Sequence, residues 1–226
     1  MFRFFGKSKR RSLETEMAGL LFKNPVGVPY VIEKQRFGLL RQASSAGFLM
    51  LNAPQDHVLP WIKELQEIRS RQMLLINVGC DIVRNFSLVY DFADLIVIDP
   101  DSDGGIGAAD ISDIRSLIDE IVSLRLCYDH YTPVFLRLRH GLTNDELHTL
   151  LSVCRLSGLD GVVVPTARMA SDVKSITDGR FPIIGKARSA EDAIEQMHAG
   201  ASLLEVNLRL SEVNHLLKTL EKQPSL

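Results

Sequence analysis

Basic residues and a helix start come together after the seventh apolar run of the chain, and they form a candidate anion site. Lys186 and Arg188 stand just before Ser189, which begins a predicted helix, and Asp192 follows three residues later. The first N–H groups of a helix have no partner within it, and the helix dipole favours negative charge there, so this loop suits phosphate. Arg209, after the eighth apolar run, adds a guanidinium. The alternative is a plain capped helix, because the Asp192 carboxylate can reach back to the Ser189 N–H.

Alternating carboxylates after the fourth apolar run have the spacing of a calcium-binding loop. Asp99, Asp101 and Asp103 stand at alternate positions, Gly104 follows, and Asp110 stands at the twelfth place. Such a loop wraps oxygens around Ca²⁺ or Mg²⁺, and the glycine permits its sharp turn. An EF-hand has a helix before the loop and a glutamate at the twelfth place. Here a predicted strand precedes the loop, and the twelfth residue is the aspartate Asp110. We therefore favour an acidic loop in which Asp110 begins the next helix, with a weak cation site as the alternative.

Other metal, redox and dinucleotide motifs are absent from the sequence. The histidines lack metal-ligand spacing, and the order GxGxxG does not occur. The three cysteines are far apart and form no CxxC pair, so we interpret them as reduced thiols and predict a cytoplasmic protein; they are Cys80, Cys127 and Cys154.

The composition is that of a globular protein. The 226 residues are 46% hydrophobic and 24% charged, with a net charge of -2. This excludes a disordered chain and argues against a nucleic-acid partner. No apolar run reaches the roughly 18–20 residues that span a bilayer. Residues 1–12 mix phenylalanines with lysines and arginines, and we expect a solvated basic tail, with peripheral contact to an anionic membrane as the alternative.

Residues 13–226 are predicted to form a single domain of eight strand-then-helix units. Continuous apolar runs are typical of parallel strands covered on both faces, and eight such units are the number in a (βα)8 barrel, or TIM barrel. A doubly wound open sheet is the alternative. Residues 13–24 read as a β-hairpin that would plug the bottom of a barrel. Residues 33–46 have helical spacing, Thr143 with Glu146 predicts a capping box at a helix start, and Gly200 predicts a helix end. The predicted strands are Val26–Val31, Gly47–Leu51, Met73–Val78, Leu95–Ile98, Val134–Leu138, Gly161–Val164, Pro182–Gly185 and Leu203–Val206.

The fold places the candidate chemistry, because barrels carry their sites at the carboxyl ends of the strands. The loops that meet there are expected to begin near Glu33, Asn52, Asn77, Asp99, Arg137, Pro165, Lys186 and Asn207.

Several of these stretches resemble the dihydroorotate dehydrogenase family, especially its membrane-linked, quinone-using class. The segment from Gly19 to Gly27, GLLFKNPVG, resembles the family's GLxFKNPVG opening. INVG at 76–79 resembles its VNIG strand. PIIG at 182–185, with EDA at 191–193 and AGAS at 199–202, resembles PIIGVGGISSxEDAxxxxxAGAS. The resemblance covers most of residues 13–222.

The resemblance implies an FMN cofactor, oxidation of dihydroorotate in pyrimidine biosynthesis, and roles for particular residues. Lys34 and Asn77 match family positions in the first and third units, and Ser102 falls about where the family's catalytic serine base stands. The loop of Lys186, Arg188 and Ser189 corresponds to the loop that binds the flavin phosphate.

At several positions where the family contacts the flavin, this sequence carries other residues. Pro29-Tyr30-Val31 stands in place of the family's Ala-Ala-Gly, and the bulk of these residues should obstruct a ring system. The glycines of the phosphate loop are missing. Arg137 replaces the flavin-contacting lysine of the fifth strand, with a different shape and reactivity.

Three hypotheses follow for the function. The first is a dihydroorotate-dehydrogenase-like barrel with an eroded FMN and orotate site, non-catalytic or altered in chemistry, that binds a phosphorylated small molecule. The second is an active FMN-dependent oxidoreductase. The third is a scaffold or interaction protein. The oligomeric state has no signal in the sequence.

Overall fold

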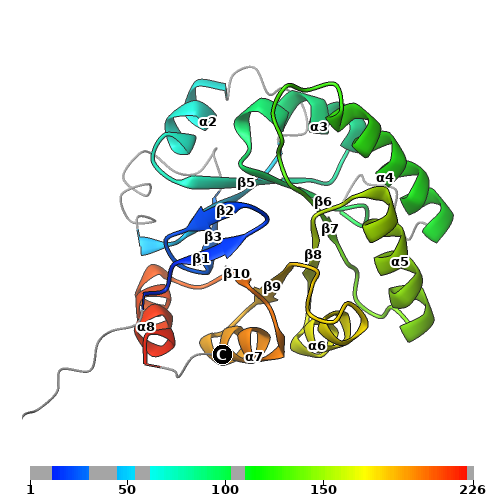
Figure 1. Cartoon of the computed structure of the whole chain (residues 1–226). Coiled ribbons are helices and arrows are strands. Elements are labelled where there is room, and N and C mark those ends of the chain that lie inside the picture. Colours follow the sequence, from blue (N-terminus) through cyan, green and yellow to red (C-terminus); the bar gives the residue numbers. More distant parts are fainter. Residues whose placement is uncertain (1–11, 31–44, 54–61, 103–109, 223–226) are drawn as a thin grey trace, which may run out of the picture.

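Eight parallel strands close into a barrel in the computed structural model, which describes residues 12–30, 45–53, 62–102 and 110–222 (Figure 1). The strand order is β10-β3-β4-β5-β6-β7-β8-β9, and Leu204 of β10 pairs with Val26 of β3 to close the ring. This pairing confirms the (βα)8 barrel and excludes the open sheet. The strands are β3 Val26–Tyr30, β4 Phe48–Asn52, β5 Met73–Val78, β6 Leu95–Ile98, β7 Val134–Arg137, β8 Gly161–Val164, β9 Ile183–Ala187 and β10 Leu203–Val206.

Helices surround the barrel and connect its strands (Figure 1). β9 runs to Ala187, two residues beyond the predicted end at Gly185, so Lys186 belongs to a strand and not to the loop after it. The predicted helix over residues 33–46 lies almost wholly outside the described residues. The described helices are α2 Ile62–Arg69, α3 Ile82–Val89, a 3-10 turn at Tyr90–Phe92, α4 Ile111–Arg125, α5 Asn144–Ser157, α6 Ala167–Ile176, α7 Ala190–Ala199 and α8 Leu210–Leu220.

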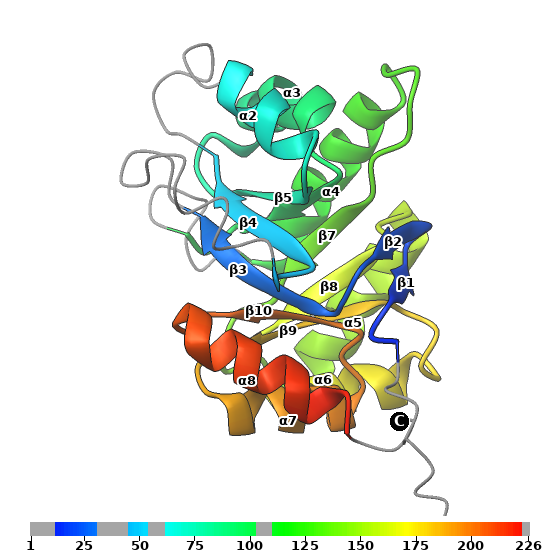
Figure 2. The ribbon, with the colours of Figure 1, turned by 90° about the vertical axis from the view of Figure 1, so that its left-hand side faces the viewer.

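The predicted hairpin covers the end of the barrel at which β3 begins (Figures 1 and 2). Its strands are β1 Thr15–Met17 and β2 Leu20–Phe22. Gly19 in the turn has a φ of 77°, a left-handed conformation that glycine adopts without a steric penalty. Met17 and Phe22 are buried, and the Phe22 ring lies edge-on to Phe48 of β4, with 5.6 Å between centroids. The hairpin therefore closes the bottom of the barrel with its own apolar side chains.

Large apolar side chains fill the interior of the barrel above this plug. Phe48 and Phe135 take up so much of the interior that the residue paired with each on the adjacent strand is a glycine. A Cβ on Gly27 would lie 1.9 Å from the Phe48 ring, and a Cβ on Gly161 would lie 2.3 Å from the Phe135 ring. The other interior side chains come from alternate positions of the strands, as the period of two along a strand requires; they include Met50, Leu75, Leu95, Val97, Val163, Ile184 and Leu203.

Helix ends follow the signals in the sequence. The Thr143 hydroxyl accepts the Glu146 N–H, and the Glu146 carboxylate accepts the Thr143 N–H, which confirms the predicted capping box at the start of α5. α7 ends at Gly200, whose φ of 115° is again left-handed. On α5, Leu147, Leu150, Leu151 and Cys154 are buried against the barrel. Caps and apolar stripes thus set where the outer layer of helices begins, ends and packs.

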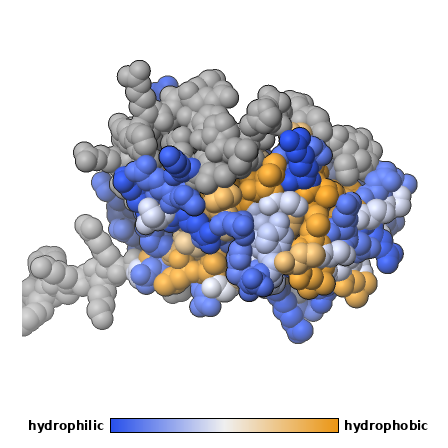
Figure 3. Space-filling view, turned by 90° about the horizontal axis from the view of Figure 1, so that it is seen from above, coloured by the Kyte–Doolittle hydropathy of each residue, from blue (hydrophilic) through white to orange (hydrophobic). Residues whose placement is uncertain are grey.

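The outer surface mixes polar and apolar side chains. Over α2, α3 and α4, hydrophobic and hydrophilic groups alternate without one continuous apolar face (Figure 3). Large exposed hydrophobic side chains occur on the hairpin and near the ends of α4 and α5: Leu21, Leu126, Tyr131 and Leu156. Of the helices within the described ranges, none combines the length and apolarity needed to cross a membrane.

The packing of α5 predicts how the cysteines react. Cys154 is fully buried, and burial raises the pKa of its thiol to about 12, whereas Cys127 is exposed. Because the thiolate is the nucleophile, iodoacetamide should label Cys127 in the native protein and Cys154 only after unfolding. Peptide-resolved mass spectrometry with and without urea measures this. Equal labelling of the two cysteines in the native protein would contradict the burial of this face of α5.

Candidate functional site

A ring of polar side chains forms the next layer toward the carboxyl ends of the strands. Each member stands two residues after an apolar interior residue on the same strand, so both project to the inside of the barrel. The inner face of each of these strands thus changes from the packed core to the polar mouth within two residues. The pairs are Met50 and Asn52, Leu75 and Asn77, Val97 and Asp99, Phe135 and Arg137, Ile184 and Lys186, and Leu203 and Glu205.

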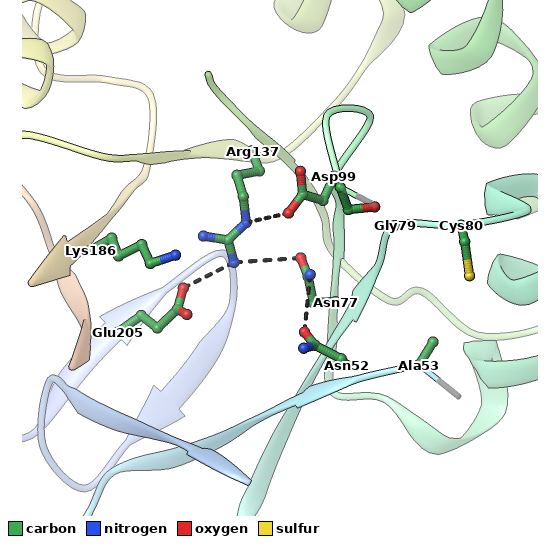
Figure 4. A pocket seen from close by; sticks show the side chains of 10 residues that line it. Asn52, Ala53, Asn77, Gly79, Cys80, Asp99, Arg137, Lys186 and Glu205 are labelled. Atoms are coloured by element: carbon green, nitrogen blue, oxygen red, sulfur yellow. Dashed lines mark hydrogen bonds and ion pairs between the residues drawn. The ribbon is translucent and has the colours of Figure 1, made fainter. Parts of the chain in front are cut away.

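Arg137 of β7 lies at the centre of this mouth and joins strands on both sides (Figure 4). Its terminal nitrogen donates to Glu205 Oε2 of β10 at 2.9 Å, and its Nε lies 3.1 Å from Asp99 Oδ2, after β6. The contact with Asp99 is an ion pair without the alignment of a hydrogen bond, since Nε has no aligned acceptor within the described residues. The side chains of all three are 13–16% exposed, so the charges are largely withdrawn from water.

Two asparagine amides extend the network across β5 and β4. The terminal nitrogen of Arg137 lies 3.4 Å from Asn77 Oδ1, and Asn77 Nδ2 donates to Asn52 Oδ1 at 3.1 Å (Figure 4). The guanidinium has no acceptor lone pair, so it orients the Asn77 amide, and that amide orients the next. Polar contacts therefore link five of the eight strands at the mouth.

These side chains enclose a cavity of about 330 Å³, lined also by Ala53, Gly79, Cys80 and Ser102. The Lys186 ammonium points into it (Figure 4) and makes no ion pair with a carboxylate of the described residues. Ser102 Oγ is buried and has no hydrogen-bond partner among those residues. It packs so closely on Gly79 that a Cβ there would lie 1.9 Å away. Among the described residues, the cavity thus holds a solvent-exposed lysine that makes no ion pair and a buried hydroxyl without a hydrogen-bond partner.

A second hollow of about 200 Å³ adjoins the cavity beyond Arg137 and Lys186, and Asp101 and Arg139 also line it. Desolvation raises the pKa of Asp101; the neighbouring Arg139 opposes this shift, and Asp99 adds to it. The two hollows share Asp99, Arg137 and Lys186, so one molecule can contact both.

The structure brings together five of the residues predicted from the sequence: Asn77, Asp99, Ser102, Arg137 and Lys186 all line the cavity. Lys34 and Asp103 lie outside the described residues.

Arg188, Ser189 and Arg209 do not line this cavity. The Arg188 N–H donates to Asp192 Oδ2 at 2.9 Å, and the Ser189 hydroxyl accepts the Asp192 N–H at 3.1 Å. This is the geometry of the capped helix. At α8, the Arg209 N–H donates to Glu212 Oε2 at 2.7 Å. A role for these three residues in anion binding remains a prediction.

One part of the prediction for the acidic loop is confirmed: Asp110 begins the next helix. Asp110 caps α4, where its carboxylate accepts the Ile111 N–H at 2.6 Å. Asp99 is directed at Arg137, and Asp101 lines the second hollow. Within residues 12–30, 45–53, 62–102 and 110–222, no group of three or more acidic, histidine or cysteine side chains is placed to hold a metal ion.

Two residues of the polar ring were not predicted as site residues from the sequence. Glu205 lies inside an apolar run, and Asn52 was identified only as the start of a loop. A signal for both existed: counting two residues on from the last inward-facing apolar residue of each strand reaches them.

The chain resembles dihydroorotate dehydrogenases in sequence and in fold, which confirms the family resemblance seen in its motifs. No family model matches it. It is 22% identical over 272 residues to the dihydroorotate dehydrogenase (quinone) of Christiangramia forsetii, in an alignment covering 88% of this chain and 80% of that protein. The DHODH of Eimeria tenella in complex with ferulenol aligns with a TM-score of 0.75 at 18% identity, over 95% of this chain and 86% of that one. Its ligand-free form aligns with a TM-score of 0.72 at 18% identity, over 94% and 87%. The chain is thus similar to these enzymes in fold and has diverged from them in sequence.

The network around Arg137 predicts a strong energetic coupling. Arg137→Met leaves two largely buried carboxylates without their cation and should lower the free energy of unfolding by about 3 kcal/mol. Adding Glu205→Gln removes one of those carboxylates, so the double variant should be more stable than the sum of the single changes predicts, by about 1–3 kcal/mol. Urea denaturation of the four proteins measures the cycle. Lys186→Met is the control and should cost less than about 0.5 kcal/mol. Additive effects would show that Arg137 and Glu205 do not depend on each other.

Proposed function

We propose that this chain is a dihydroorotate-dehydrogenase-like barrel that has exchanged its FMN and orotate contacts for a charged polar site, and that it binds a small phosphorylated molecule without flavin-dependent oxidation. One observation carries the proposal: Arg137 is held between Asp99 and Glu205 at the centre of the mouth.

The cavity is a poor receptor for a flavin ring. Cofactor pockets are mostly apolar, with a few polar groups that set orientation. Here six of the ten lining residues carry charged or amide side chains, and none of the described lining residues is aromatic or a branched aliphatic. A flat ring entering this space would strip water from Asp99, Glu205 and Arg137 and return few hydrogen bonds, which is costly. Pro29 stands two residues after the inward-facing Gly27 on β3 but does not line the cavity, so obstruction of a ring by Pro29 stays a prediction from the sequence.

The loop at the start of α7 is also altered for a flavin phosphate. Asp192 takes the Arg188 N–H, and Ser189 takes the Asp192 N–H. The carboxylates of Glu191 and Asp192 match the family's own EDA motif, so the alteration lies in the loop before them, where Lys186-Ala187-Arg188 stands in place of the family's glycines. The residues present therefore do not fit FMN bound in the manner of the family, and we assign no step to that cofactor.

An anionic group finds its partner at Lys186 instead. The ammonium points into the cavity, and the two carboxylates that line this cavity with it, Asp99 and Glu205, are engaged by Arg137. A charge-assisted contact of this kind is worth about 1.5–3 kcal/mol net. In this proposal Lys186 binds the phosphate, the carboxylates and amides orient the remainder of the ligand, and Arg137 holds them in place.

The proposed location is the cytoplasm. The three free cysteines agree with it, because disulfides are rare there.

An active FMN-dependent dihydroorotate oxidoreductase is the second candidate, and Ser102 favours it. Its hydroxyl lines the cavity, is buried and lacks a partner, which suits a base that waits for a substrate proton. The sequence similarity to a quinone-type enzyme points the same way. The third candidate, an interaction protein, has only scattered exposed leucines on the described surface in its favour.

An absorbance spectrum separates the two leading candidates. The purified full-length protein should be colourless between 350 and 500 nm, roughly the range in which flavins absorb, and added FMN should not co-elute in gel filtration. Dihydroorotate with a quinone acceptor should show no turnover above a blank. A stoichiometric flavin with turnover that Ser102→Ala abolishes would refute the proposal and establish the oxidoreductase.

A further inference from the structure

The hydrogen-bonding groups of the cavity specify more than an anion. Apart from Ala53, Gly79 and Cys80, every described lining residue carries a strong hydrogen-bonding side chain. A ligand that displaces water here must return those hydrogen bonds, because a buried polar group left unpaired costs about 1–3 kcal/mol. The ligand must therefore be polar over most of its length. The volume of about 330 Å³, at the small end for ligand pockets, limits it to a small molecule.

The network around Arg137 leaves both donors and acceptors for the ligand. Asp99 and Glu205 each use one carboxylate oxygen on the guanidinium, so their second oxygens can accept. Asn52 accepts through Oδ1, which leaves its NH₂ group to donate. Ser102 Oγ, buried and unsatisfied, can do either. Alcohol hydroxyls match this set, because each one both donates and accepts.

Lys186 sets the position of the charged end. Its ammonium enters the cavity from β9, on the side of Glu205 and away from Cys80 (Figure 4). No described acidic residue pairs with it. The hydroxyl-binding groups belong to another part of the lining: Asn52 is the last residue of β4, and Ser102 follows β6. An anionic group at Lys186 and hydroxyls toward Asn52 and Ser102 would satisfy both ends.

We infer that the cavity binds a short polyol with one terminal anionic group, the chemistry of a sugar phosphate or a sugar acid. This rests on the proposed function, which it makes specific: Lys186 binds the anion, and Asp99, Glu205, Asn52 and Ser102 bind the hydroxyls.

Calorimetric titration of the full-length protein with matched probes tests the inference. The probes are ribose phosphate with the phosphate on its primary hydroxyl, free ribose, inorganic phosphate and ribonate. Ribose phosphate or ribonate should bind at least about tenfold more tightly than free ribose or inorganic phosphate, because only the joined molecule contacts both ends. Tighter binding of ribose phosphate assigns a phosphate to Lys186 and supports both proposals. Tighter binding of ribonate assigns a carboxylate, which supports the polyol anion and contradicts the phosphorylated ligand of the proposed function.

Variants locate the site. Lys186→Met should weaken the better probe at least about tenfold, whereas Lys63→Met, which removes an exposed lysine of α2, should leave its affinity unchanged. Asn52→Ala should weaken free ribose and the joined probe but not inorganic phosphate. Near-ultraviolet circular dichroism checks that each variant is folded.

Two outcomes would overturn the inference and are distinct from failure of the proposed function. Inorganic phosphate binding as tightly as ribose phosphate would leave an anion site without polyol recognition, and absence of binding by every probe would remove the ligand class altogether. FMN retained on the protein would instead refute the proposed function itself. FMN carries a polyol phosphate joined to a ring, so its exclusion alongside binding of ribose phosphate supports both proposals.

Discussion

The ion pairs of Arg137 with Asp99 and Glu205 are the constraint on which the mouth of this barrel depends. Three ionised side chains at 13–16% exposure are stable only as a group, because the desolvation of each charge is offset by its neighbours. They join the ends of β6, β7 and β10, which are not all adjacent in the barrel. The orientation of two further polar groups follows from theirs: Asn77 is oriented by Arg137 and Asn52 by Asn77. The same pairs leave Lys186 as the cation available to a ligand.

A packed core supports this charged layer. Along each strand, an apolar residue in the interior is followed two residues later by a polar residue at the mouth, so the floor of the site is the top of the core. Phe48 and Phe135 fill that core so fully that Gly27 and Gly161 have no room for a side chain. Met17 and Phe22 of the hairpin close the other end. A rigid floor of this kind holds charged side chains within hydrogen-bonding distance, and such preorganisation distinguishes a binding site from a set of surface charges.

Resemblance to dihydroorotate dehydrogenases extends to the scaffold and to the order of its motifs, while the groups at the mouth argue for a different ligand. A barrel can keep its core and change its chemistry because the core and the site lie in different layers of the same strands. Residues that pack inside the barrel constrain one another through volume, whereas residues at the mouth contact the ligand and one another. Replacing a lysine by Arg137 at the mouth thus leaves the barrel intact, and the carboxylates around it determine what the new guanidinium can do.

The sequence by itself determined the local structure of this protein. Apolar runs predicted the strands, Thr143 with Glu146 and Gly200 predicted helix ends, and eight units predicted the barrel, because these signals lie within a few residues of one another. It also named Asn77, Asp99, Arg137 and Lys186 through the rule that barrel sites lie at strand ends. Only the tertiary structure decided that β10 pairs with β3, and that Arg137 contacts Glu205, 68 residues away along the chain. Counting in steps of two along β10 places Glu205 on the inner face, but only closure of the barrel shows that its partner is Arg137. For the Asp192 carboxylate, the spacing predicted the Ser189 N–H as its partner, whereas the path of the chain into α7 brings the Arg188 N–H to it instead.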